Sequence, residues 1–173
     1  MKIDSTTRVF VTLGLAIEAL LVATLRLGDL GQNVPRAVLV QMLIATLYIA
    51  GSFFVLLPSE DKRLYRGVIL GFAVVFRLTV WPLYPTLTDD VYRYRWEGML
   101  QAAGGNPYEA RPADSRWISL RDETFERVVG RDFKAGYGPL TEAVELGTYR
   151  LVNQITSDPW GQVFWFKLPA AFF

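Results

Sequence analysis

Two adjacent acids, Asp89 and Asp90, are the residues of this chain best suited to acid–base chemistry. The 173-residue sequence contains no histidine and no cysteine, so it lacks the commonest general base and any thiolate nucleophile or metal ligand. Catalysis near neutral pH would therefore fall to carboxylates, with lysine or tyrosine as weaker alternatives. The acid pair directly follows a hydrophobic run, and ionised side chains are costly near hydrocarbon unless they serve a function.

The same two acids also have a structural interpretation. Thr88 or Asp89 is a good N-cap for a helix that runs to about Ala103, where two glycines follow. Asp90 would then lie in the first turn, at the positive end of the helix dipole. Capping and catalysis can coexist, with one aspartate capping the helix while the other reacts, and the sequence leaves open which does which.

Arginine and aromatic side chains crowd the acid pair within residues 91–98. Arg93 and Arg95 are able to clamp a phosphate group, and they can equally pair with a neighbouring acid. Tyr92 and Trp96 belong to a wide apolar and aromatic surface of the expected helix. This surface predicts an interfacial helix that lies along a membrane, with its Trp and Tyr side chains at the level of the lipid headgroups.

Three hydrophobic runs precede the acid pair, at residues 9–25, 37–57 and 67–84. Each is close to the roughly 20 residues that a helix needs to cross a bilayer. The first run contains one acid, Glu18, which we expect to be structural, either protonated or paired with Arg77 or Gln41. Together with a composition that is 51% hydrophobic, the runs predict an all-α fold, a polytopic bundle of membrane helices.

Lysine and arginine near the short loops predict the orientation of these spans. Five basic residues flank the side that holds the N-terminus, against two on the other side. They are Lys2, Arg8, Lys62, Arg63 and Arg66 against Arg26 and Arg36. The N-terminus is therefore expected in the cytoplasm, and the Asp89-Asp90 segment outside it.

The chain is accordingly expected to have three parts. Residues 1–84 form three transmembrane helices, residues 85–138 form an extracytoplasmic loop that carries the acid pair and a short helix near 119–129, and residues 139–173 begin further membrane helices. The last hydrophobic run stops at Phe172-Phe173 without a polar flank, which predicts an N-terminal fragment of a longer protein. The helix expected at 140–155 carries several charges and would pack inside a larger bundle.

An ordered set of short motifs fills the second half of the chain. They are Thr88-Asp89-Asp90-Val91-Tyr92-Arg93-Tyr94-x-Trp96-Glu97-Gly98, then Gln101-x-x-Gly104-x-Asn106-Pro107-Tyr108, and then Tyr137-Gly138-Pro139-Leu140. This set resembles bacterial GT-C integral membrane glycosyltransferases, most closely the polyprenyl-phosphate-mannose-dependent mannosyltransferase-like branch. The likeness covers roughly residues 81–173, about half of the chain.

The resemblance implies an activity and a set of site residues. A polyprenyl-phosphate sugar would be the donor and a glycan or lipid of the cell envelope the acceptor. The transfer, of mannose as in the family, would invert the anomeric centre and take place at a bacterial cytoplasmic membrane. Asp89 or Asp90 would act as the general base. The candidate substrate-binding residues are Arg93, Tyr94, Arg95, Trp96, Glu97, Asn106, Tyr108 and Tyr137. The fragment alone would be inactive, because the missing helices normally help to bind the lipid carrier.

Two other functions fit the same residues. A transporter or flippase would line its path with Glu18, Arg77 and the acid pair, and a non-catalytic assembly subunit would use the acids only as helix caps. A net charge of +1 gives no indication of nucleic acid binding. No cofactor is expected, although Asp89, Asp90 and Glu97 leave a divalent cation open.

Overall fold

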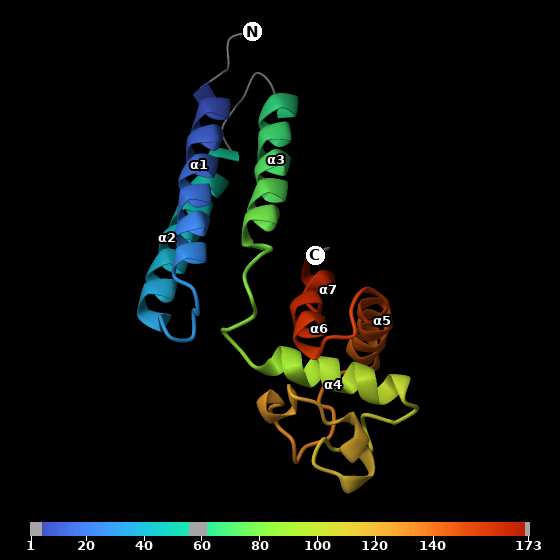
Figure 1. The fold of residues 1–173 in the computed structure, drawn as a ribbon. Helices are drawn as coiled ribbons and strands as arrows, with labels where there is room; N and C mark the ends of the chain where they lie inside the picture. The colour runs from blue at the N-terminus through green and yellow to red at the C-terminus, as the bar shows by residue number, and fades with distance from the viewer. Residues whose placement is uncertain (1–4, 56–61, 172–173) are drawn as a thin grey trace. The chain divides into compact units, whose positions relative to one another are not determined.

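The computed structural model describes residues 5–55 and 62–171 and divides the chain into two compact units, Met1–Tyr84 and Pro85–Phe173. The regular structure within the described ranges is helical, without strands, which confirms the all-α prediction. Figure 1 shows the helices in chain order. Lys2, residues 56–57 of the second hydrophobic run and the terminal Phe172-Phe173, all used in the sequence analysis, lie outside the described residues.

Unit 1 contains three helices, α1 (Ser5–Arg26), α2 (Val34–Val55) and α3 (Lys62–Val80), and α1 packs against both of the others. Helices α1 and α2 are each 22 residues long and apolar enough to cross a membrane. The apolar side chains of α2 point outward, with Met42 65% and Phe53 67% exposed, as expected of a helix that faces lipid. Helix α3 does not meet the same test, because every 18-residue window of it contains at least three basic residues.

Glu18 is paired within unit 1, although not with the partners that the sequence predicted. Its Oε1 accepts a hydrogen bond from the hydroxyl of Thr79 at 2.5 Å, which joins α1 to α3. Arg77 instead donates to the carbonyl of Ala73 on its own helix. The hydroxyl of the penultimate residue of α3 therefore bonds one of the two carboxylate oxygens of this acid within an apolar helix.

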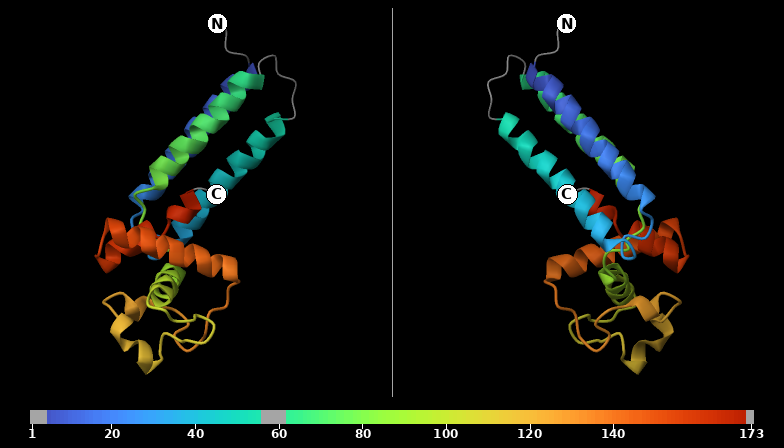
Figure 2. Two further views of the ribbon diagram at one scale, coloured as in Figure 1. Left: turned by 90° about the vertical axis from the view of Figure 1, so that its right-hand side faces the viewer. Right: turned by 90° about the vertical axis from the view of Figure 1, so that its left-hand side faces the viewer.

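Unit 2 is organised around α4 (Asp90–Ala102). Figures 1 and 2 show α4 between two layers, with helix α5 (Pro139–Ile155) and α6 (Pro159–Trp165) on one side and an irregular segment on the other. The irregular segment contains two 3-10 turns, η1 (Ser115–Leu120) and η2 (Phe125–Arg127), and a short helix α7 (Leu168–Ala171) follows α6. The single helix expected near 119–129 is therefore wrong.

Local chemistry explains why that segment is irregular. Arg121 donates to the carbonyls of Pro112, Ala113 and Asp114, and the Asp122 carboxylate accepts from the backbone and hydroxyl of Thr124. Such side-chain hydrogen bonds to the backbone compete with helical ones.

The ends of α4 follow the sequence prediction closely. Its first backbone N–H, that of Asp90, donates to the hydroxyl of Thr88 at 3.2 Å. At the other end Gly104 adopts a φ of +85°, and the N–H groups of Gly104 and Gly105 return to the carbonyls of Gln101 and Leu100. This is the Schellman pattern, in which a glycine in the left-handed region closes the last turn of a helix.

Helix α4 is a core helix of unit 2, which corrects the expectation of an aromatic face at the lipid headgroups. Tyr92 and Trp96 are each 1% exposed and Leu100 is 0% exposed. The ring of Tyr92 meets the edge of Trp160 on α6, with 6.1 Å between ring centroids. The aromatic surface that resembled a membrane anchor is thus covered by the protein's own helices and loops.

Helices α4 and α5 cross steeply (Figure 2), and they approach each other closely at Gly98. A Cβ atom at Gly98 would lie 2.6 Å from the carbonyl oxygen of Glu145 and 2.9 Å from the Cβ of Tyr149. Since one contact is to backbone, the helices must separate to accept any side chain here.

We expect Gly98→Ala to destabilise the protein by about 1–3 kcal/mol, because overpacking displaces backbone. The measurement is thermal unfolding followed by tryptophan fluorescence. Gly147→Ala is the matched control, because Gly147 lies on α5 with open space around its Cβ position, and alanine there should be neutral or stabilising. Equal stability of the Gly98→Ala variant and the parent would contradict the close approach.

Candidate functional site

The acid pair lies at the start of α4, and its two members have different surroundings. Asp89 occupies the N-cap position, but its side chain makes no capping hydrogen bond. Its Oδ1 instead accepts from Nη2 of Arg127 at 2.6 Å, in an ion pair whose side chains are 39% and 45% exposed. Asp89 is therefore tied to the irregular segment rather than to the helix that it precedes.

Asp90 is the less constrained of the two acids. It lies half-buried in the first turn of α4, where the helix dipole favours a negative charge. Its carboxylate makes no hydrogen bond or ion pair with any other described residue, and only its backbone N–H is bonded, to Thr88. Asp90 is thus the carboxylate of the pair that is available to an outside ligand.

Arg95 points into unit 2 and uses its donors within the protein. Its Nε donates to Gln162 at 2.9 Å, its Nη1 to the hydroxyl of Thr124 at 3.0 Å, and its Nη2 to Asp122 at 2.7 Å. The residue is 4% exposed. The structure gives Arg95 the role of joining α4 to α6 and to the irregular segment.

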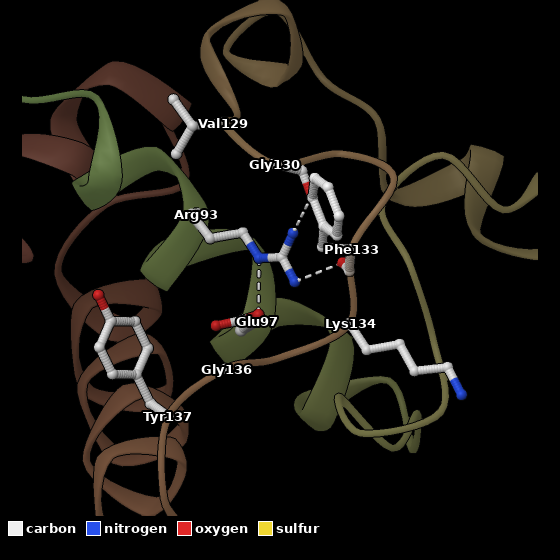
Figure 3. A pocket seen from close by; sticks show the side chains of 8 residues that line it. All are labelled: Arg93, Glu97, Val129, Gly130, Phe133, Lys134, Gly136 and Tyr137. Carbon is white, nitrogen blue, oxygen red and sulfur yellow. Dashed lines mark hydrogen bonds and ion pairs between the residues drawn. The ribbon is translucent and has the colours of Figure 1, made fainter.

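Arg93 is buried in the same way, on another face of α4. Its Nε donates to Oε1 of Glu97 at 2.6 Å, while Nη1 and Nη2 donate to the carbonyls of Gly130 and Phe133 at 2.7 and 2.9 Å. Figure 3 shows these bonds holding the end of the irregular segment over α4. The Cζ of Arg93 also lies over the buried ring of Trp96, 5.7 Å from its centroid, so this ring face is not open to a sugar.

A cavity of about 170 Å³ lies beside Arg93 and Glu97 (Figure 3). Its lining is Arg93, Glu97, Val129, Gly130, Phe133, Lys134, Gly136 and Tyr137. Sites for drug-sized ligands are roughly 300–1,000 Å³, so this cavity suits one ring or one headgroup. Lys134 is its exposed cation, and its side chain extends away from Arg93.

Three tyrosines connect the cavity to the acid pair. The hydroxyl groups of Tyr94 and Tyr137 are 3.1 Å apart, and the hydroxyl of Tyr108 donates to the carbonyl of Tyr137 at 3.0 Å. Tyr94 lies one helical turn from Asp90, and Tyr137 lines the cavity. The three predicted residues Tyr94, Tyr108 and Tyr137 therefore come together at the cavity that Tyr137 lines.

These tyrosines are hydrogen-bonding groups rather than bases. Burial, then the hydrogen bond with Tyr137, raises the pKa of Tyr94 well above its usual value. Burial, then the negative charge of Glu142, also raises the pKa of Tyr108. Both shifts favour the neutral hydroxyl, so Tyr94 and Tyr108 are poorly suited to act as the general base.

Asn106 belongs to the turn after α4. Its side-chain oxygen accepts from the N–H of Tyr108 at 3.0 Å, and its amide donates to Glu109 at 3.0 Å. This Asx turn orients Tyr108 toward Tyr137. Asn106 therefore acts on the three tyrosines indirectly, by fixing the position of Tyr108.

The structure adds a carboxylate cluster that the sequence did not single out. Glu97 of α4 meets Glu142 and Glu145 of α5, with one oxygen from each within 4.8 Å of the others. Their exposed fractions are 1%, 3% and 5%. The spacing of Glu142 and Glu145, i and i+3 on one helix face, was the available signal. Within the described ranges, Asp89 and Asp90 do not join Glu97 in such a group.

Burial changes the acidity of this cluster. It raises the pKa of Glu142 to about 7, and the negative charge of Glu97 adds to the shift. It raises the pKa of Glu145 to about 9, with Glu97 and Glu142 again contributing. Without a counter-charge beyond Arg93, the cluster resists full ionisation at neutral pH.

Two helices long and apolar enough to cross a membrane, and a cavity lined by tyrosine and charged side chains, fit a membrane protein with a site for a polar ligand. A family model described as Alpha-(1->6)-mannopyranosyltransferase, N-terminal domain, matches residues 11–172, and the chain belongs to this family. It is thus a glycosyltransferase domain, as the motifs predicted. The family and the two apolar helices both fit a membrane protein. Comparisons with curated proteins and with solved structures gave no match.

The Arg95 network predicts a pH dependence of stability. Burial would raise the pKa of Asp122, but hydrogen bonds from Arg95 and Thr124 outweigh it and lower that pKa. A carboxyl whose pKa is lower in the folded state stabilises the fold above its unfolded pKa of about 3.9, and loses that contribution as the pH falls toward the folded pKa.

We therefore expect the midpoint of thermal unfolding to fall as the pH drops below about 4, and to fall less steeply in Asp122→Asn. The measurement is tryptophan fluorescence at a series of pH values. Glu123→Gln, at an exposed neighbouring acid, should keep the parent slope. Parallel profiles for the parent and Asp122→Asn would contradict the network.

Proposed function

We propose that this domain carries the catalytic base of an inverting mannosyltransferase that uses a polyprenyl-phosphate donor. Asp90 is the base, and the acceptor is a hydroxyl group of an envelope glycan or lipid. The observation that supports this most is that no described residue bonds the Asp90 carboxylate, which lies one turn from Tyr94. The hydroxyl of Tyr94 contacts that of Tyr137, which lines the cavity. Since the matched model describes an N-terminal domain, transfer is expected to need the rest of the enzyme.

The proposed chemistry is a single displacement. The acceptor oxygen forms a bond to the anomeric carbon, the bond from that carbon to the phosphate oxygen breaks, and its electron pair leaves with the polyprenyl phosphate. Asp90 takes the acceptor proton as the bond forms. A phosphate leaves readily without protonation, so one carboxylate suffices. An α product then requires a β-linked donor, because the displacement inverts the anomeric centre.

The surroundings of Asp90 divide the remaining tasks. Tyr94, Tyr108 and Tyr137 offer neutral hydroxyl groups and ring faces to the sugar. Lys134 is the cation placed for the phosphate, because the guanidinium groups of Arg93 and Arg95 are already bonded to protein acceptors. Arg93 and Glu97 line the cavity. Arg95 and Trp96 fix α4 within the core of unit 2, and Asn106 orients Tyr108.

The orientation proposed for the site follows the distribution of basic residues. Arg8 and Arg66 belong to the side richer in positive charge, which is kept in the cytoplasm, whereas Asp90 belongs to a segment beyond the end of α3. We therefore place the N-terminus in the cytoplasm of a bacterium and Asp90 on the outer side of its cytoplasmic membrane. There a polyprenyl-phosphate sugar and an envelope acceptor can meet.

Replacing the acids singly tests the base. We expect Asp90→Asn in the complete enzyme to lower kcat about 10²–10⁴-fold, the usual contribution of a general base. Asp89→Asn should cost much less, because it removes only an exposed ion pair. The measurement is transfer of labelled mannose from polyprenyl phosphate to acceptor.

Asp132→Asn is the matched control, because Asp132 is an exposed acid of the same unit. Unchanged transfer in Asp90→Asn would contradict the assignment of the base. A loss confined to Asp89→Asn would move the base to its neighbour.

Lys134 tests the donor phosphate site separately. We expect Lys134→Gln to raise the KM for the donor about 10–100-fold with a smaller change in kcat, because a hydrogen bond to a charged group contributes about 1.5–3 kcal/mol. Arg116→Gln, at a side chain 72% exposed, is the control for loss of positive charge. An unaltered donor KM in Lys134→Gln would exclude this residue from phosphate binding.

A further inference from the structure

The cluster of Glu97, Glu142 and Glu145 contains more acceptor oxygens than the protein satisfies. Arg93 donates to Oε1 of Glu97, and the amide of Gln101 donates to Oε2 of Glu142 at 3.1 Å. The other four oxygens, Oε2 of Glu97, Oε1 of Glu142 and both oxygens of Glu145, are buried without a partner among the described residues. Buried polar atoms rarely lack a hydrogen-bond partner, because such an atom loses its hydration without gaining a bond in return.

Glu145 is the strongest single indication of a missing ligand. The residue is 5% exposed, and no nitrogen or hydroxyl donor of a described residue bonds to its carboxylate. One of its oxygens lies within 4.8 Å of oxygens of Glu97 and Glu142, and Glu97 is close enough to share a proton with it. An acid that served only to pack α5 on α4 would not need to meet two further acids. Its position is instead what a shared positive ligand requires.

The charges of the cluster indicate the valence of that ligand. Three carboxylates face one guanidinium, that of Arg93, so two negative charges remain when all are ionised. One divalent cation would neutralise them. Carboxylate oxygens are hard ligands, which select Mg²⁺, Mn²⁺ or Ca²⁺ over softer metals.

We propose that Glu97, Glu142 and Glu145 bind one divalent cation between α4 and α5. The four unpartnered oxygens are the protein ligands. Glu97 also lines the cavity beside Arg93, so ligands from the cavity, such as water or a phosphate oxygen, can complete the coordination. The cation would hold α4 to α5 next to their contact at Gly98, where Glu145 takes part in both, and would add positive charge beside the cavity.

Proton sharing is the competing account of the same geometry. With no cation, Glu142 and Glu145 would be protonated near neutral pH, in keeping with their raised pKa values, and would donate to one another or to Glu97. The two accounts predict opposite effects of removing a carboxylate. A cation site loses its ligand with Glu145→Gln, whereas a proton-sharing cluster tolerates the neutral amide.

Metal binding is measured on the complete protein in detergent, after chelation and dialysis. Mn²⁺, Mg²⁺ and Ca²⁺ are added singly, and thermal unfolding is followed by tryptophan fluorescence. We expect one of them to raise Tm by about 5–10 °C at roughly hundredfold excess over its Kd. Electron paramagnetic resonance should count one bound Mn²⁺ per chain. Glu145→Gln should lose both the shift and the bound Mn²⁺, and Glu123→Gln, at an exposed acid, should keep them.

The proposal is overturned if no cation shifts Tm and no Mn²⁺ is retained, or if Glu145→Gln retains both. Should Glu145→Gln fail to fold, Glu142→Gln takes its place, and the Mn²⁺ count on the parent protein still decides. A parent that binds no cation, with a Glu145→Gln variant of raised Tm, assigns the cluster to proton sharing. Since the readout is binding and not transfer, its failure leaves the assignment of Asp90 untouched.

Discussion

The burial of charged side chains on α4 is the constraint on which unit 2 depends. A helix that carries Arg93, Arg95 and Glu97 can lie in a core only if each charge finds partners, because removing one partner of a buried ion pair costs about 3–5 kcal/mol. Arg95 therefore draws in Asp122, Thr124 and Gln162, and Arg93 draws in the carbonyls after η2. These bonds fix the backbone of the irregular segment against α4, although few of its residues are helical.

Because the two arginines stabilise the fold, other residues of unit 2 must contact the substrate. The guanidinium groups that would suit a phosphate are occupied inside the protein, whereas Asp90, Lys134 and Tyr137 reach the surface or the cavity. Tyr94 links the two sets, because it stands on the buried helix and bonds to Tyr137. The rigidity of α4 is thus passed on to the tyrosines that lie one turn from Asp90.

The sequence predicted what depends on neighbouring residues. The start of α4 at Asp90 and its closure by Gly104, just beyond Ala102, follow from local rules. The different surroundings of Asp89 and Asp90 do not, because the partner of Asp89 is Arg127, 38 residues away. Trp96 was misjudged, because an aromatic helix face packs equally well against lipid or against the protein itself.

Partners distant in sequence could not be predicted in this way. Arg95 and Gln162 lie 67 residues apart, and no periodicity marks them as a pair. The meeting of Glu97 with Glu142 and Glu145 depends on how α4 crosses α5, which the sequence does not specify. The same holds for the cavity, which exists because Arg93 holds Gly130 and Phe133 over α4.

The most direct test of the proposed base is a structure of the complete enzyme with a non-reactive polyprenyl-phosphate mannose analogue and an acceptor. The acceptor hydroxyl should lie within about 2.6–3.2 Å of the Asp90 carboxylate and about 3–3.5 Å from the anomeric carbon. The sugar should contact Tyr94 and Tyr137. A donor bound in reactive geometry away from Asp90, with the acceptor hydroxyl facing another base, would contradict it.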